Sequence, residues 1–381
     1  MKGLDLFQSK NLDANEFCRV LLHFLGSGSY KDGNVVYSSK QAPEKKIEIQ
    51  LTKADRIYSI TVDSGFPKHE LAGAIAKVKT ALIDDQRSIT GRIVAFCEYP
   101  ISGYFKGDFF QILPMPQGAP TYPRAPYPFL LEFTYCYSKD WIVNDLRRRA
   151  TAKKLSALLS VFTGAKIMSS SEIAKYGWYT IYNDNSRPMP HFGELGYFFI
   201  DMPNEEVFSD TSKLKRLRVL NTQRSSGQLG LAIPQDLNGL MNKAQNLENP
   251  KHNQFHNACL LTSFALENTD ISRSIEYLAL ICAIESLISF TDKCTECDQY
   301  KGATKQFKQF VNRYSTDADT KQSAAKFYDQ RSKISHGSQL MGSDIEPDFL
   351  NWKPSIEEQK DVLHRTLVMV KKCLTGWLKE Q

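Results

Sequence analysis

The segment FYDQRSKISHGS, residues 327–338, separates Arg331 from His336 by four residues. An arginine and a histidine held close together suit the cleavage of a phosphodiester bond. RNA supplies its own nucleophile, the 2′-hydroxyl, so the protein must move a proton and stabilise charge on the phosphate in the transition state. An imidazole can move the proton and a guanidinium can stabilise the charge, without a metal ion. The spacing alone also fits a non-catalytic alternative, in which the histidine lies at a helix end and the arginine on the surface.

A helix expected over residues 320–336 must position this pair. Tyr328 and Arg331 lie on one stripe of that helix, so Arg331 is expected to face a buried partner or another subunit. Gly337 is expected to end the helix. His336 would then lie at the helix C-terminus, where the macrodipole favours a protonated imidazole by ~0.3–1 kcal/mol. That placement suits a histidine that works in acid–base catalysis.

Glu285 lies in a second helix, expected over residues 271–290. This helix is apolar on nearly all sides, which predicts a buried central position. A carboxylate in such a helix is costly unless it is paired. We expect an ion pair that holds Arg331 or another cation of the bundle in place, and a direct catalytic role is the alternative.

The chain after about residue 253 has only helical patterns, whereas residues 231–252 form a loose, polar connector. The helices are expected over residues 256–267, 271–290, 305–313, 320–336 and 355–378. Their order predicts an up-and-down helical bundle over residues 253–381.

The first 230 residues mix strand and helix patterns and predict an α+β domain. Strands are expected over residues 46–51, 56–62, 88–99, 104–113 and 129–137, and helices over residues 69–83 and 141–162. The proline-rich residues 114–128 are expected to form an extended connecting loop, with a partner-binding segment as the alternative. The predicted fold class is therefore multidomain α+β, with a mixed α/β domain followed by an all-α bundle.

The motif RSKISHG, residues 331–337, resembles the RxxxxH signature of HEPN domains and is close to the form found in Apea-like HEPN proteins. The apolar helix YLALICAIESLISF and the order of the later helices also resemble that family, over residues 253–381. The resemblance implies a domain that dimerises, so that two motifs form one composite, metal-independent endoribonuclease site. It further implies a role in phage defence, toxin–antitoxin systems or RNA-targeting immunity.

The resemblance also implies roles for the residues of the motif. Arg331 would orient or stabilise the scissile phosphate, and His336 would be the acid–base residue. The family often has Asn, Asp or His directly after the arginine, whereas Ser332 stands here, so a secondary polar role of this position stays open. Tyr328 is expected to support the site through packing or the interface. Lys333 is a candidate for contact with RNA phosphate, with a solvated lysine as the alternative.

The charge of the chain is uneven. It holds 48 basic and 42 acidic residues, and the whole net charge of +6 lies in the first 250 residues, because the remaining 131 balance. This modest excess argues against a nucleic-acid-coating protein but allows contact with a polyanion. The candidates for RNA contact are Arg147 and Arg148 in one cluster, and Lys215, Arg216 and Arg218 in another. The alternative is that both clusters are charged faces that are simply exposed to solvent.

Neither a cofactor nor a metal ion is expected. Cys294 and Cys297 form a lone CxxC, and His252 and His256 could complete a zinc site only if the fold brought them close. The longest apolar stretch is interrupted by Glu285 and is too short for a membrane span, and the N-terminus lacks the apolar core of a signal peptide. Eight cysteines fit free thiols in a reducing compartment, so a cytoplasmic protein is expected.

Two functions from different classes fit the chain. The first is an endoribonuclease that acts on RNA as a homodimer, with the first domain as a sensing or regulatory part. Such an enzyme could be dormant until this domain detects a phage-derived trigger. The second is a non-catalytic interaction protein, in which the bundle only dimerises and the N-terminal domain binds a ligand or partner.

Overall fold

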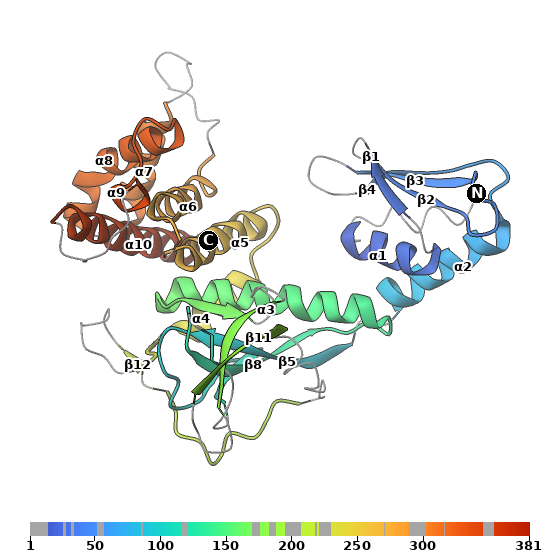
Figure 1. Ribbon diagram of the computed structural model, residues 1–381, viewed down its shortest axis with the longest axis horizontal. Helices are drawn as coiled ribbons and strands as arrows, with labels where there is room; N and C mark the ends of the chain where they lie inside the picture. The colour runs from blue at the N-terminus through green and yellow to red at the C-terminus, as the bar shows by residue number, and fades with distance from the viewer. Residues whose placement is uncertain are drawn as a thin grey trace. The chain divides into compact units, whose positions relative to one another are not determined.

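The computed structural model describes the chain as two compact units (Figure 1). The described residues are 14–25, 28–31, 34–51, 57–84, 87–115, 121–122, 124–169, 176–182, 188–194, 207–217, 219–220, 230–269, 271–289, 302–315, 317–345 and 354–381. Unit 1 comprises Met1–Gly91, Thr134–Thr151 and Asn204–Val207, and unit 2 comprises Arg92–Phe133, Ala152–Pro203 and Phe208–Gln381. Sheets lie in the N-terminal region and helices in the C-terminal region, so the expected mixed α/β class is confirmed.

An antiparallel sheet in the order β1-β2-β3-β4 forms the centre of unit 1. The elements of this unit are β1 (Gly28–Lys31), β2 (Asn34–Ser38), β3 (Lys46–Leu51), β4 (Ile57–Val62), α1 (Ala14–Leu25), α2 (Lys68–Lys79) and the π-helical turn η2 (Thr80–Asp84). The alternation in KIEIQL buries Ile47 and Ile49, as expected for a strand with one buried face. These side chains share one core with Phe17 and Leu25 of α1 and Val78 of α2.

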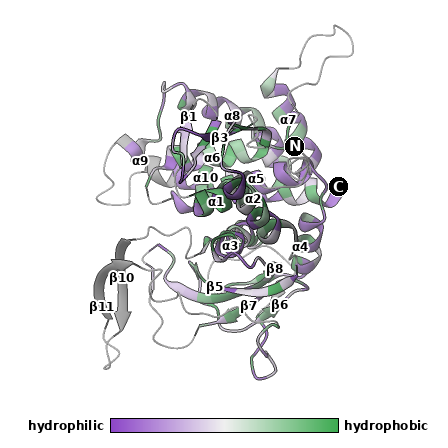
Figure 2. Cartoon of the chain, turned by 90° about the vertical axis from the view of Figure 1, so that its right-hand side faces the viewer, coloured by the Kyte–Doolittle hydropathy of each residue, from purple (hydrophilic) through white to green (hydrophobic). Residues whose placement is uncertain are grey.

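Unit 2 contains a sheet in the order β6-β7-β8-β5-β9. Its strands are β5 (Ser88–Cys97), β6 (Phe105–Lys106), β7 (Phe110–Pro114), β8 (Tyr127–Cys136) and β9 (Ile167–Ser169). The helix α3 (Trp141–Thr163) lies along one face of this sheet (Figures 1 and 2). The ends of β5, β8 and α3 belong to unit 1. The single strand expected over residues 104–113 is two strands instead, because the chain turns where the N–H of Gly107 donates to the carbonyl of Phe110.

Short strand pairs complete the described β structure. They are the antiparallel pair β10 (Tyr176–Tyr182) and β11 (Pro188–Glu194), and the parallel pair β12 (Val219–Leu220) and β13 (Ile233–Pro234). After β13, the chain continues into the helices of the C-terminal part.

A buried charged cluster crosses the sheet of unit 2. Glu132 on β8 is fully buried and accepts hydrogen bonds from Arg92 Nε (2.6 Å), Gln111 Nε2 (2.5 Å) and the Ser209 backbone N–H (2.9 Å) and hydroxyl (2.6 Å). Burial alone would raise the pKa of Glu132, but these hydrogen bonds outweigh it and lower the pKa below its usual value. The cluster fastens the segment that carries Ser209 to the sheet.

The C-terminal part of unit 2 is a helical bundle with α6 at its centre (Figures 1 and 2). Its helices are α4 (Leu237–Gln245), α5 (Lys251–Glu267), α6 (Arg273–Glu285), α7 (Ala303–Tyr314), α8 (Ala318–Ser335), α9 (Gly342–Ile345) and α10 (Pro354–Glu380). Tyr277 of α6 is buried, and its hydroxyl donates to the carbonyl of Phe327 on α8 (2.7 Å). Phe255 of α5 stacks on Trp377 of α10, with ring centroids 5.7 Å apart. The helices that the sequence predicts are present in the predicted order.

The segment expected to be a loose connector carries helical structure. Helix α4 lies within residues 231–252, and α5 begins at Lys251. Leu237, Leu240 and Met241 are buried at i, i+3 and i+4, which gives α4 an apolar face to pack on α5 and α10. Its asparagines lie among these apolar residues and mask the helical pattern in the sequence.

Among the described helices, none combines the length and the apolar character that a membrane crossing requires.

We expect Glu132→Gln to lower the free energy of unfolding by roughly 3 kcal/mol, because Arg92 would keep its charge beside a buried neutral amide. The lowered pKa of Glu132 means that its contribution is complete above the pKa of the unfolded chain and is lost as the pH falls through the folded pKa. Urea unfolding at pH 7 and pH 4 should therefore show a smaller acid-induced loss in the variant. Asp361→Asn, in the exposed pair with Arg365, is the control and should change little. An equal response of both variants would contradict the prediction.

Candidate functional site

The C-terminus of α8 positions His336. The N–H of Gly337 donates to the carbonyl of Ile334 (3.0 Å), and the N–H of Ser338 donates to the carbonyl of Lys333 (3.0 Å). Gly337 has a φ of +69°, which glycine adopts without strain. This pair of bonds is a Schellman motif. The predicted helix end at Gly337 is confirmed, and His336 is the C-cap residue with an exposed side chain.

Arg331 is held on the inner side of α8 by two residues. Its Nη2 lies 3.0 Å from Oε2 of Glu285, the last residue of α6. The hydroxyl of Tyr328 donates to the other carboxylate oxygen of Glu285, also at 3.0 Å, and the Tyr328 ring centroid is 5.7 Å from the guanidinium carbon. The ion pair expected for Glu285 is therefore present, with Arg331 as its cation.

The exposure of this cluster leaves part of Arg331 accessible. The Arg331 side chain keeps 27% of its area exposed, against 13% for Glu285. The Nε atom of Arg331 is buried and makes no hydrogen bond within the described part of the chain. One edge of the guanidinium is thus engaged by the protein, and the group still reaches the surface. A phosphate oxygen could approach Arg331 from that surface.

The cluster keeps its neighbours protonated. Burial lowers the pKa of Arg331, but the charge of Glu285 outweighs it and raises the pKa, so the guanidinium stays cationic. Burial and the charge of Glu285 raise the pKa of Tyr328, and they also raise that of Cys282, one turn earlier on α6. Tyr328 therefore serves as a hydrogen-bond donor, and Cys282 is a neutral thiol and a poor nucleophile at neutral pH.

Arg331 and His336 leave α8 in different directions. Residues of an α-helix are rotated by about 100° each, so two residues five positions apart point about 140° apart and lie about 7.5 Å apart along the axis. Ser332, between them, is half-buried. Lys333 forms an exposed ion pair with Asp329 (2.9 Å). One α8 helix thus presents the guanidinium and the imidazole on separate faces.

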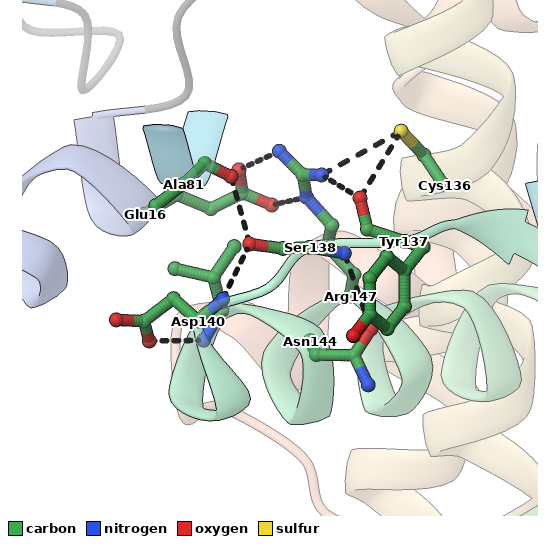
Figure 3. A network of polar contacts seen from close by, with 9 residues as sticks. Glu16, Ala81, Cys136, Tyr137, Ser138, Asp140, Asn144 and Arg147 are labelled. Atoms are coloured by element: carbon green, nitrogen blue, oxygen red, sulfur yellow. Dashed lines mark hydrogen bonds and ion pairs between the residues drawn. The ribbon is translucent and has the colours of Figure 1, made fainter. Parts of the chain in front are cut away.

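Arg147, a predicted RNA contact, is used inside unit 1. Its guanidinium makes a two-pronged ion pair with Glu16 of α1, with both N–O distances at 2.8 Å (Figure 3). It also donates to the carbonyl of Tyr137 (3.1 Å) and contacts Cys136 Sγ (3.5 Å). This arrangement joins α1, the end of β8 and the start of α3. No local pattern in the sequence indicates this ion pair, because Glu16 and Arg147 are 131 residues apart.

The other basic candidates differ in their surroundings. Arg148 pairs with Asp145 at 2.7 Å. Lys215 and Arg216 are exposed, and Arg216 Nε donates to the hydroxyl of Tyr104 (3.2 Å). Arg218 lies outside the described residues.

The candidate metal ligands are described only in part. Cys294 and Cys297 lie outside the described residues. His252 and His256 of α5 have ring centroids 4.3 Å apart, but no group of three or more candidate ligands occurs in the described part. Burial, followed by the charges of His252 and Lys154, lowers the pKa of His256 to about 3.

No family model, no curated protein and no solved structure matches this chain.

We expect Glu285 and Arg331 to be energetically coupled. A double-mutant cycle with Glu285→Gln and Arg331→Met, measured by urea unfolding, should give a coupling energy of about 1 kcal/mol, a value reduced by the partial exposure of Arg331. Lys333→Met removes an exposed i,i+4 pair on the same helix and is the matched control. A coupling energy near zero would show that Glu285 does not hold Arg331 in solution.

We expect His256 to make the folded state sensitive to acid. The unfolded chain binds a proton near pH 6.5, whereas the folded protein resists it down to about pH 3. The stability that the neutral His256 contributes is therefore fully present above pH 6.5 and decreases as the pH falls toward 3. His256→Leu should remove roughly 2 kcal/mol of the loss in unfolding free energy between pH 7 and pH 5. His364→Leu, at an exposed position of α10, should leave the loss unchanged.

Proposed function

We propose that the bundle of α5 to α10 is an HEPN-type endoribonuclease domain, which cleaves RNA without a metal ion at a composite site in a homodimer. The observation that supports this most is the cluster of Arg331, Glu285 and Tyr328. It holds a permanently charged guanidinium at the surface of the helix whose C-cap is His336.

The proposed reaction is transesterification. One imidazole removes the proton of the RNA 2′-hydroxyl, and the 2′-oxygen attacks the adjacent phosphorus. The bond from phosphorus to the 5′-oxygen breaks, and this oxygen takes a proton from a second imidazole. The products are a 2′,3′-cyclic phosphate and a 5′-hydroxyl. Arg331 stabilises the charge that develops on the phosphate oxygens. Since Arg331 and His336 diverge on α8, two subunits are needed to bring the groups to one phosphate.

The proposed biological setting is cytoplasmic antiviral defence of the abortive-infection type. In this proposal the N-terminal residues sense a phage-derived trigger and keep the nuclease dormant in its absence. The support is the resemblance of the RSKISHG motif and the presence of a separately packed unit before the bundle.

The ion pair itself supports a second candidate function. An arginine held by a carboxylate and a tyrosine also serves well as a structural element. In that case the bundle only dimerises or binds a partner, and the N-terminal region binds a ligand. RNA cleavage that depends on His336 would rule this function out.

We expect His336→Ala to lower RNA cleavage by at least roughly 100-fold in EDTA, because an acid–base group typically contributes that much. The assay uses full-length protein and follows the appearance of 2′,3′-cyclic phosphate ends. His69→Ala, an exposed histidine of α2, is the matched control and should cleave like the unmodified protein. Cleavage that survives the His336 substitution, that stops in EDTA, or that comes from a strictly monomeric species would disprove the mechanism.

A further inference from the structure

A cavity of about 1120 Å³ lies inside unit 2, away from the cluster around Arg331. Its walls come from the C-terminal end of α3, the segment of β13 and the start of α4, the end of α5, the start of α6 and one face of α10. Its volume slightly exceeds the ~300–1,000 Å³ that is typical of small-molecule sites, so it has room for a ligand of that class.

The wall of this cavity is cationic. Among the described lining residues, cations outnumber carboxylates six to three. The cations are Arg124, Lys166, Arg273, Lys360, Lys371 and Lys379. One ion pair among the lining residues joins Lys379 and Asp236 at 2.7 Å, and six cations against three carboxylates leave a net charge of +3. The excess of positive charge favours an anionic ligand.

Helix α10 gives the cavity two cationic ends and an apolar middle. Lys360, His364, Leu367 and Lys371 recur at i, i+4, i+7 and i+11, so they lie on one face. Lys360 and Lys371 are about 16 Å apart along the helix. Leu363, Leu367 and Val368 fill the stretch between them. An elongated ligand with an apolar body and an acidic end matches this face.

Lys371 approaches the end of α3 at Gly164. A Cβ atom at Gly164 would contact the Nζ atom of Lys371, so the lysine side chain passes close to the backbone at the end of α3. Gly164 also has a φ of +70°, which other residues rarely adopt. Gly164 and Lys371 thus lie next to one another at the cavity wall.

The N-terminus of α6 does not serve as the anion site. The carboxylate of Asp344 already accepts hydrogen bonds from the N–H groups of Arg273 (2.9 Å) and Ser274 (2.8 Å). An anion in the cavity would instead meet cationic side chains, and those of Arg273, Lys360 and Lys371 lie at the wall.

We propose that this cavity binds a small organic anion with an apolar body, held at its acidic group by cations of α6 and α10. This inference goes beyond the proposed nuclease function and does not depend on it. A fatty-acid-like carboxylate and a nucleotide share this chemistry.

The test uses two naphthalene probes on the full-length protein. Anilinonaphthalene sulfonate carries an acidic group, and N-phenyl-1-naphthylamine has the same arene without it. We expect the sulfonate to bind more tightly than the neutral probe, and Lys360→Met and Lys371→Met each to weaken it roughly 5- to 10-fold while leaving the neutral probe unchanged. Lys372→Met is the matched control, because Lys372 is the neighbour of Lys371 on α10 and is not among the described lining residues.

A filling substitution tests the same site without removing a charge. Leu367→Trp narrows the apolar middle and should weaken both probes at least 5-fold, with an unchanged circular dichroism spectrum. Displacement of the sulfonate by decanoate but not by AMP identifies a carboxylate with an aliphatic body, and the reverse identifies a nucleotide. Sulfonate binding that is indifferent to Lys360→Met, Lys371→Met and Leu367→Trp would overturn the proposal, as would equal affinity for both probes.

Discussion

The anchoring of α8 on α6 is the contact on which the candidate site depends. Before the end of α8, Arg331 pairs with Glu285 at the C-terminal end of α6. After the end of α8, Asp344 accepts a hydrogen bond from the N–H of Arg273 at the N-terminal end of α6. His336 lies in the chain between these anchors. The chain that carries this exposed turn is therefore anchored to the central helix on both sides, which limits the positions that His336 can take.

The carboxylate clusters around Glu132 and Glu285 in unit 2 both balance a carboxylate that is shielded from solvent, but they differ in how exposed the partner cation is. Glu132 is fully buried and satisfied by a guanidinium, an amide and a serine, so its cluster can only hold the sheet together. Glu285 meets a guanidinium and a tyrosine hydroxyl, and its partner Arg331 stays about a quarter exposed. The exposure of the cation, rather than the strength of the pair, therefore distinguishes an ion pair that only stabilises the fold from one whose cation can also bind a ligand.

Periodicity in the sequence predicted those features of the fold that depend on local structure. The apolar pattern of α6 located its central position, and a carboxylate in such a helix implied a cation like Arg331. Long-range pairs were beyond reach, because Arg147 and Glu16, or Ser209 and Glu132, meet only through tertiary packing. Arg147 shows the consequence. The sequence made it a candidate for RNA contact, but its charge is already balanced by Glu16 inside unit 1.

The spacing of Arg331 and His336 on α8 bears on the two-chain site that we propose. Arg331 points toward α6 and His336 lies on the terminal turn, with about 140° of rotation between residues five apart. Within one chain they do not face one another. A two-fold axis near the end of α8 would form each contact between the two chains twice. The guanidinium of each chain could then meet the imidazole of the other. Lys333 on the same turn is paired with Asp329. In the proposed homodimer, the second subunit would supply the further positive charge that a phosphorane-like transition state demands.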